Sequence, residues 1–320
     1  MLHSGRELAL VTGGAGFIGS HLVEALLAEG LRVRVADNLS TGRRSNLQGM
    51  EGAIEWFELD LSNFENCRKV AEGVDFVFHQ AAIPSVPRSV KEPLTSHENG
   101  PTTTLNVLEA SRQAGVRRVM FAASSSAYGE TEELPKHEGM PPNPLSPYAA
   151  GKLAGEHYVR VYAKSMGLDG VSLRYFNIFG PRQDPSSPYS GVISQFSKGM
   201  AEGRRPSIYG DGQQTRDFTF VANAVAANLL AMRAPHPLKG EVYNVGGGER
   251  ISLLDLVASI NAILGTDLEP TFLPPRAGDI RDSLASLTRI KAAIGYEPVV
   301  NFEEGLSRTV QSQASVATVG

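Results

Sequence analysis

The chain has 320 residues, of which 42% are hydrophobic, and a formal net charge of −4 at pH 7. This length can bury a large core, as one α/β unit or as two domains. The mild acidity, with no block of about five or more Lys or Arg residues, argues against a nucleic-acid partner or an anionic membrane surface. No apolar run approaches the roughly 18 residues of a membrane span. We expect no signal peptide, because the first strand-like run begins at Leu8.

Cysteine and histidine usage is sparse. The single cysteine, Cys67, can form no internal disulfide, which is typical of a reducing compartment and predicts a cytoplasmic protein. The seven histidines show no HxxxH or HExxH spacing, and no second cysteine exists to form a pair. We therefore expect no transition-metal site.

Strand-like apolar runs alternate with helical patterns through the first half of the chain. The expected strands are Leu8–Val11, Leu31–Ala36, Ile54–Leu59, Val74–His79, Arg117–Ala122 and Val171–Tyr175. The expected helices are Phe17–Glu29, Asn63–Glu72, Thr102–Ala114 and Pro147–Met166. This alternation predicts an α/β fold, a doubly wound parallel sheet of Rossmann type with helices on both faces. Ligands of such sheets bind at the carboxyl ends of the strands.

The pattern loosens after Tyr175 into Pro- and Gly-rich polar segments. Helical patterns return at Val221–Met232 and Ser252–Leu264, with a short strand, Val242–Val245, between them. We expect a nucleotide-binding domain over residues 1–175, with 221–245 returning to it, and a smaller α/β substrate domain over 176–220 and 246–320. The small, polar tail Gln311–Gly320 is expected to be disordered.

A glycine-rich turn, with Gly13, Gly16 and Gly19, joins the first strand to the first helix. This context is typical of a dinucleotide site, although a glycine turn without a ligand is the alternative. Gly13 permits the tight turn, Gly16 lets the backbone approach a pyrophosphate, and Gly19 lets the helix pack on the strand. The free N–H groups of the helix N-terminus, at Phe17 and Ile18, suit the phosphates.

Asp37 ends the second strand-like run, about where the dinucleotide motif places its acidic residue. A carboxylate there suits the two ribose hydroxyls of NAD and repels the 2′-phosphate of NADP. The structural alternative is an aspartate that only caps a turn. Arg43 and Arg44 follow closely and keep NADP open as the other cofactor.

Tyr148 and Lys152 are four residues apart in an expected helix and therefore share one face. A nearby ammonium favours the phenolate, so we expect the pKa of Tyr148 to be lowered and this residue to accept a proton from a reacting hydroxyl. Upstream, Ser124, Ser125 and Ser126 follow an expected strand and can hydrogen-bond a hydroxyl or a ketone. A solvated polar loop is the alternative for the three serines.

The motifs TGGAGFIG, HQAA, SSSAYG, SPYAAGK, LRYFNIFGPRQ, GDGQQTRDF and RAGD together resemble the extended short-chain dehydrogenase/reductases, and within them the UDP-hexose 4-epimerases. The resemblance runs from about residue 8 to about residue 308. It implies NAD as cofactor, a UDP-sugar as substrate, and a homodimer formed through the helices Thr102–Ala114 and Pro147–Met166. The glycine turn and the Tyr–Lys pair are typical of the whole superfamily, whereas the later motifs belong to the sugar-nucleotide domain.

Carried over by motif, the resemblance implies that Tyr148 is the catalytic base, that Lys152 is its partner and holds the nicotinamide ribose, and that Ser124 shares the substrate proton. The further cofactor ligands that it implies are Asn38, Asp60, Leu61, Gln80, Ala81, Ala82, Asn99 and Tyr175. The further substrate ligands that it implies are Ser85, Val86, Ser125, Ser126, Asn177, Tyr209, Arg216, Arg276, Asp279 and Ser283. A guanidinium gives bidentate donors to a phosphate, which agrees with the two arginines.

The reaction implied is oxidation at C4, rotation of the 4-keto sugar and return of the hydride. The family's 4,6-dehydratases and decarboxylases carry further acids where this chain has Ser125 and Ser126, so elimination is not expected. The alternatives are a UDP-glucuronate 4-epimerase, a catalytically silent NAD-binding sensor and a net oxidoreductase. The intact Tyr–Lys pair argues against the sensor, and Asp37 argues against an NADPH-dependent oxidoreductase.

Overall fold

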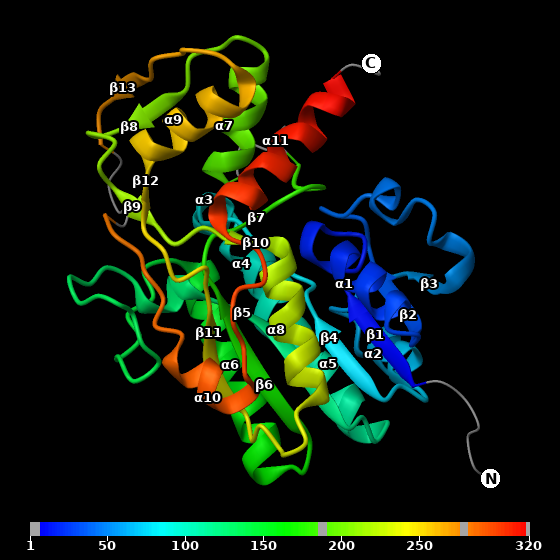
Figure 1. Ribbon diagram of the computed structural model, residues 1–320. Coiled ribbons are helices and arrows are strands. Elements are labelled where there is room, and N and C mark those ends of the chain that lie inside the picture. The colour runs from blue at the N-terminus through cyan, green and yellow to red at the C-terminus, as the bar shows by residue number, and fades with distance from the viewer. Residues whose placement is uncertain (1–6, 185–190, 276–280, 318–320) are drawn as a thin grey trace. The chain divides into compact units, whose positions relative to one another are not determined.

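The computed structural model describes residues 7–184, 191–275 and 281–317. The chain divides into two units, and Figure 1 labels its helices and strands. The first contains residues 1–127, 146–174 and 227–243, and the second contains 128–145, 175–226 and 244–320. The segment 128–145, placed in the first domain from sequence, thus groups with the second unit. Long-range bonds explain this, because Tyr128 Oη donates to Asn244 Oδ1 at 2.7 Å and Lys136 N donates to Leu284 O at 2.8 Å.

A seven-stranded sheet is built mainly by the first unit. Its strand order is β11 (Glu241–Val245), β6 (Asp169–Tyr175), β5 (Arg118–Ser124), β4 (Phe76–His79), β1 (Leu8–Thr12), β2 (Arg32–Asp37) and β3 (Ile54–Glu58). Strand β1 is entirely buried and pairs in parallel with β2 on one side and β4 on the other. The chain direction therefore reverses at β1, which is where ligands of such sheets bind. The order confirms the expected Rossmann-type fold.

Helices cover this sheet as the crossovers require. Helix α1 (Phe17–Ala28) packs on β1 and β2, whereas α2 (Phe64–Ala71), α5 (Thr103–Gln113) and α6 (Pro147–Ser165) pack on one another in that order, and α6 also packs on β5. Beneath α2, α5 and α6 lies an apolar core that includes Val77, Val107, Phe121 and Val159. The remaining short elements of this unit are η1 (Arg44–Leu47), η2 (Glu51–Ala53), α3 (Val86–Lys91), α4 (Pro93–His97) and η4 (Ser125–Tyr128, whose last residue belongs to the second unit).

A π-helical turn, η3 (Glu98–Thr102), precedes α5 and was not expected from sequence. Its buried Pro101 lacks an N–H and cannot continue an α-helical ladder, so the backbone widens there. The side chains of Thr103 and Thr104 donate to the carbonyls of Glu98 and Gly100 at 2.9 Å each. These side-chain bonds satisfy carbonyls that the altered turn releases.

Three short strand pairs and four helices are described in the second unit. The pairs are β7 (Ile178–Phe179) with β10 (Thr219–Phe220), β8 (Ser207–Tyr209) with β13 (Thr271–Leu273), and β9 (Thr215–Arg216) with β12 (Ile251–Ser252). The helices are α7 (Val192–Ala201), α9 (Leu253–Leu264), α10 (Thr288–Ile294) and α11 (Phe302–Ala317). Helices α7, α9 and α11 pack together. The expected disorder of Gln311–Gly320 is wrong up to Ala317, because α11 continues to that residue.

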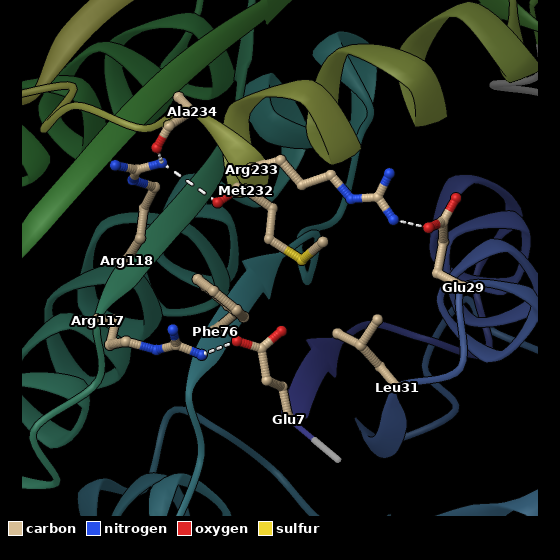
Figure 2. Close-up of a pocket in the computed structure, with 9 residues that line it drawn as sticks. All are labelled: Glu7, Glu29, Leu31, Phe76, Arg117, Arg118, Met232, Arg233 and Ala234. Atoms are coloured by element: carbon tan, nitrogen blue, oxygen red, sulfur yellow. Dashed lines mark hydrogen bonds and ion pairs between the residues drawn. The ribbon is translucent and has the colours of Figure 1, made fainter.

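Arg118, the first residue of β5, fixes the end of α8 (Val221–Arg233) and the loop that follows it. Its Nε donates to Asp169 Oδ2 at 2.6 Å, and Nη2 donates to His236 O at 2.7 Å. Its Nη1 donates to the carbonyls of Ala231, Met232 and Ala234 at 2.6, 3.2 and 3.0 Å. A helix C-terminus leaves such carbonyls without partners, so one buried guanidinium caps α8 (Figure 2).

A pocket of about 440 Å³ lies in the first unit at the amino ends of β1, β4 and β5 (Figure 2). This is the end opposite to the one where parallel sheets bind ligands. It is therefore not the candidate site. Besides Arg118 and Ala234, its lining consists of the apolar side chains Leu31, Phe76 and Met232 and of two ion pairs, Glu7–Arg117 and Glu29–Arg233.

Candidate functional site

The glycine turn after β1 brings backbone close to backbone. Gly13 has φ +66°, and a Cβ there would lie 2.8 Å from the N and Cα of Ala81. A Cβ on Gly19 would lie 2.1 Å from Gly13 O. Helix α1 begins directly after its N-cap residue, Gly16, which has no side chain to cap it. The first N–H groups of α1, at Phe17 and Ile18, therefore suit a pyrophosphate.

Asp37 ends β2 and is buried beside this turn. Its Oδ2 accepts from Ala15 N at 2.9 Å and its Oδ1 accepts from Leu39 N at 2.8 Å. Burial raises the pKa of this carboxyl above its usual range, and the charge of Glu58, its register partner on β3, adds to the effect. The carboxylate thus holds the turn through both of its oxygens.

Arg43 and Arg44, the two arginines that could bind the 2′-phosphate of NADP, differ in their surroundings. Arg43 N donates to Ala15 O at 2.9 Å, which ties its backbone to the glycine turn. The guanidinium of Arg44 lies 4.8 Å from the ring centroid of Trp56 and 3.9 Å from a carboxylate oxygen of Glu58. Two carboxylates, Asp37 and Glu58, end neighbouring strands, which favours NAD over a cofactor with a 2′-phosphate.

Replacing Asp37 by Ala is expected to weaken NAD binding about tenfold or more, since a charge-assisted hydrogen bond to ribose is lost. The preference over NADP should narrow, because the repulsion of the 2′-phosphate is lost too. Titration of both dinucleotides by calorimetry measures the effect. Asp37→Asn keeps the shape and removes only the charge, so it serves as the companion variant. Unchanged NADP affinity in both variants would show that Asp37 does not face the ribose.

The other predicted cofactor positions of the first unit lie at strand ends or in the π turn. Asn38 Nδ2 donates to Asp60 Oδ2 at 3.2 Å. Leu61 is buried in the apolar core, and the side chain of Asn99, in η3, donates to Thr95 O at 3.0 Å. Gln80 N donates to Thr12 O at 3.2 Å, which holds the segment Gln80–Ala82 beside the glycine turn.

His79, in the HQAA motif, is a residue that the sequence reasoning missed. Its Nδ1 lies 2.8 Å from Thr12 Oγ1 and its Nε2 lies 3.1 Å from Thr104 Oγ1. Its ring stacks on Phe121 at 5.6 Å, and burial lowers its pKa to about 3, so it stays neutral. Thr12 Oγ1 in turn accepts from Ala81 N at 3.3 Å. The position of the motif at a strand end was the available signal.

The predicted catalytic side chains meet at the carboxyl end of β5. Ser124 ends this strand, and its Oγ accepts from the Oγ of Ser126 at 2.8 Å and from Ser126 N at 3.2 Å. The side chain of Ser124 also hydrogen-bonds Tyr148. Ser125 follows in the first turn of η4. Ser124 can therefore pass a proton between the serine cluster and Tyr148.

One face of α6 carries Tyr148, Lys152 and Glu156 at successive turns. Lys152 Nζ donates to Ala122 O at 2.7 Å, and burial lowers its pKa to about 8 although Glu156 raises it. Both carboxylate oxygens of the buried Glu156 accept from Arg174, at 2.8 Å each. Helix α6 begins at Pro147, with the hydroxyl of Ser146 accepting from Ala149 N, which fixes the start of this face.

The expected lowering of the Tyr148 pKa is wrong for the chain without bound cofactor or substrate. Burial raises this pKa, and the hydrogen bond from Ser124 only partly opposes the rise. The ammonium of Lys152 donates to Ala122 O at 2.7 Å rather than to Tyr148. Desolvation of a phenolate therefore outweighs the expected attraction.

Two predicted substrate residues of the first unit lie at the start of α3. Ser85 is buried and is the N-cap of this helix, because its Oγ accepts from Arg88 N at 3.1 Å. Val86 is exposed. The capping bond occupies one lone pair of Ser85 Oγ and leaves its O–H free to donate.

Three of the seven ligands predicted in the second unit lie around the segment Thr215–Asp217. Asn177 has a positive φ of 32°, and its Nδ2 donates to Asp217 O at 3.2 Å. Arg216 Nη1 donates to Thr215 O and to Arg281 O at 2.9 and 3.1 Å. Ser283 is buried and donates its N–H to Thr215 O at 3.2 Å.

Four further predicted residues lie elsewhere in the sequence of this unit. Tyr175 is buried at the end of β6, and Tyr209 ends β8, where its carbonyl accepts from Gln214 Nε2 at 2.6 Å. Arg276 and Asp279 lie outside the described residues. The structure therefore gives no position for the RAGD motif.

Over residues 7–184, 191–275 and 281–317, no helix is long and apolar enough to cross a membrane. Within those ranges, no three or more His, Cys, Asp or Glu side chains are grouped to hold a metal ion.

The glycine turn at the switch point and the Ser–Tyr–Lys arrangement define a nucleotide-dependent enzyme of the short-chain dehydrogenase type. Residues 9–246 match the model of the NAD dependent epimerase/dehydratase family, and the chain belongs to this family. A UDP-glucose 4-epimerase of Mycolicibacterium smegmatis is 41% identical over 307 residues, covering 94% of this chain and 97% of the relative.

Two solved structures are also similar over nearly the whole chain. A UDP-N-acetylglucosamine 4-epimerase from Methanobrevibacter ruminantium, in complex with UDP-N-acetylmuramic acid, is 38% identical with a TM-score of 0.93, over 98% of this chain and 99% of that one. A UDP-glucose 4-epimerase of Thermus thermophilus, in complex with NAD, is 40% identical with a TM-score of 0.87, over 96% and 98% of the two chains.

Proposed function

We propose that this chain is an NAD-dependent 4-epimerase of UDP-hexoses. Its substrates are UDP-glucose and UDP-galactose, together with UDP-N-acetylglucosamine and UDP-N-acetylgalactosamine. The observation that carries the proposal is the placement of Ser124 at the carboxyl end of β5 with Tyr148 and Lys152 one turn apart on α6, where Lys152 Nζ reaches Ala122 O of β5. The names of the relatives, which are UDP-sugar 4-epimerases, support the same reaction.

In this reaction Tyr148 accepts the proton of the C4 hydroxyl and Ser124 shares it by hydrogen bonding. NAD⁺, when bound here, would supply the acceptor for the C4 hydride, which returns to the opposite face of the 4-keto sugar, and the positive charge of the nicotinamide would favour the phenolate. The protonated Lys152 holds the nicotinamide ribose and adds positive charge to the site. The glycine turn and Asp37 would hold the pyrophosphate and the adenine ribose.

The serines beside Ser124 support epimerisation rather than elimination. Loss of water from a sugar requires an additional acid to protonate the leaving hydroxyl. In η4 the corresponding side chains are the hydroxyls of Ser125 and Ser126, and the latter donates to Ser124. A hydroxyl can position a ketone but cannot act as that acid near neutral pH.

The direct test is to incubate the purified protein separately with UDP-glucose, UDP-N-acetylglucosamine and UDP-glucuronate, and to separate the products. We expect UDP-galactose and UDP-N-acetylgalactosamine without net formation of NADH. If only UDP-glucuronate gives a product, the substrate is a UDP-uronate and not a UDP-hexose. Net NADH release would indicate an oxidoreductase, and no product from any of the three would favour a silent sensor.

Ser283→Tyr is expected to abolish conversion of the N-acetylated pair while sparing UDP-glucose and UDP-galactose. Ser283 is buried and held by Thr215 O, so a large side chain has to fill space within the unit. Ser283→Ala, which adds no volume, is the control. The ratio of kcat/KM for the two substrate pairs measures the effect. An unchanged ratio in Ser283→Tyr would remove the residue from substrate selection.

We further propose a homodimer. Apolar side chains are exposed on α3, α4 and α6, which pack together: Val90 is 64% exposed, Leu94 84% and Val161 49%. By contrast, Arg112 and Gln113 are exposed on α5. These observations favour α6 with α3 and α4 as the surface for a second copy. Light scattering during size-exclusion chromatography tests this, and a monomer at micromolar concentration would contradict it.

A cytoplasmic location is also proposed. Its support is the single thiol, Cys67, which is buried and whose pKa burial raises to about 12. A protonated, inaccessible thiol neither requires nor uses an oxidising compartment. Cell fractionation tests the proposal, and recovery with an extracytoplasmic fraction would contradict it.

A further inference from the structure

Asp217, between Arg216 and Phe218 in the second unit, is a fully buried carboxylate that joins two loops. Its Oδ1 accepts from Gly247 N at 2.6 Å, and its Oδ2 accepts from Ala285 N at 3.0 Å and from Gly248 N at 3.3 Å. Thr219 Oγ1 lies 3.4 Å from Oδ1. Three backbone N–H groups from two distant segments therefore converge on one side chain.

The residues around Asp217 are those expected to hold the substrate. Arg216 precedes it directly, and Asn177 Nδ2 donates to its carbonyl at 3.2 Å. The positive φ of Asn177, unusual for a residue other than glycine, is supported by this bond and by Thr219 N donating to Asn177 O at 3.2 Å. Ser283 lies two residues before Ala285, whose N–H Asp217 binds.

The loop Gly246–Gly248 has no side chains that would block the approach of this carboxylate. A Cβ on Gly246 would lie 2.8 Å from Asp217 Oδ2, and a Cβ on Gly247 would lie 2.7 Å from Phe218 O. Tyr296 Oη donates to Gly246 O at 2.9 Å and holds the loop from its other side. The backbone can thus occupy only a narrow range of positions around Asp217.

We propose that Asp217 is a positioning residue for the UDP-sugar. Its carboxylate fixes residue 217 against the backbone of Gly247 and Ala285, and so positions the segments that carry the adjacent Arg216 and the nearby Ser283 before the ligand arrives. Asn177 is held to the same residue through the Asp217 carbonyl. Binding then requires little further ordering of these side chains. The affinity for the ligand rises because less conformational entropy is lost on binding. The inference rests on the proposed function and assigns Asp217 to substrate affinity, not to proton or hydride transfer.

The test compares Asp217→Asn with Thr219→Val. The amide keeps the shape of the carboxyl but turns an N–H₂ group toward a backbone donor, whereas Thr219→Val removes only the longest contact. We expect Asp217→Asn to raise the KM for UDP-glucose and the Kd for UDP about ten- to a hundredfold, with kcat within threefold or so and the Kd for NAD unchanged. Thr219→Val should behave as wild type.

The melting temperature of each variant is measured as well. Gly247→Ala is a second variant, because it displaces the N–H donor of residue 247 and leaves the charge of Asp217 intact. It should raise KM in the same direction. Wild-type UDP affinity in Asp217→Asn or in Gly247→Ala, with only the melting temperature lowered, would reduce Asp217 to a structural role. Failure of Asp217→Asn to fold leaves Gly247→Ala to decide. A wild-type chain that binds neither UDP nor UDP-glucose would overturn the proposed function, and this inference with it.

Discussion

Replacing Tyr148 by Phe is expected to lower kcat about 10²–10⁴-fold while UDP-sugar binding is retained. The ring stays on α6, and only the hydroxyl that hydrogen-bonds Ser124 is lost. Because burial raises the pKa of this hydroxyl, formation of the phenolate is expected to depend on the positive charge of the bound nicotinamide. Without the hydroxyl, no group of the described site remains to take the C4 proton.

Tyr162→Phe is the matched control. Tyr162 lies on the same helix, and its Oη donates to Glu109 at 3.0 Å, at a position that the mechanism does not use. We expect its kcat to match that of the wild type. Steady-state rates with UDP-glucose, together with calorimetric binding of UDP to each variant, make the comparison. Turnover by Tyr148→Phe within a few fold of wild type would remove Tyr148 from proton transfer.

The parts of the fold that could be predicted from sequence depend on local pattern. The glycine turn, the parallel sheet and α6 follow from apolar periodicity and from residues such as Gly13 and Pro147, whose backbone preferences act within a few positions. The π turn could not be predicted, because Pro101 permits a helix end, a kink or a widened turn. Packing and the hydroxyls of Thr103 and Thr104 select among these outcomes.

In the candidate site, too, local features could be predicted from the sequence and features that depend on distant residues could not. The spacing of Tyr148 and Lys152 placed both on one helix face, but the direction of the Tyr148 pKa shift depends on burial, which spacing does not specify. Asp217 was missed because its partners, Gly247 and Ala285, are distant in sequence. The grouping of 128–145 with the second unit has the same cause, since it follows from pairing with residues far along the chain.

Arg118→Met is expected to lower the free energy of unfolding by about 3–5 kcal/mol, the cost of breaking a buried ion pair from one side. The substitution removes the donors to Asp169 and to four carbonyls at the end of α8 and just beyond it, while the methionine retains much of the apolar stem. Arg118→Lys should recover little, because a single ammonium cannot span carbonyls that a planar guanidinium reaches from two nitrogens.

The neighbouring Arg117→Met is the control for this prediction. Arg117 is half exposed, pairs with Glu7 and lies 4.3 Å from the ring centroid of Phe76, so its loss should cost about 0–1 kcal/mol. Both arginines line the same pocket (Figure 2), but only Arg118 is buried with backbone carbonyls as partners. Urea unfolding at pH 7, followed by circular dichroism, measures both variants. Equal losses for the two would mean that the end of α8 is held by packing alone and that the guanidinium of Arg118 adds no more than a surface charge.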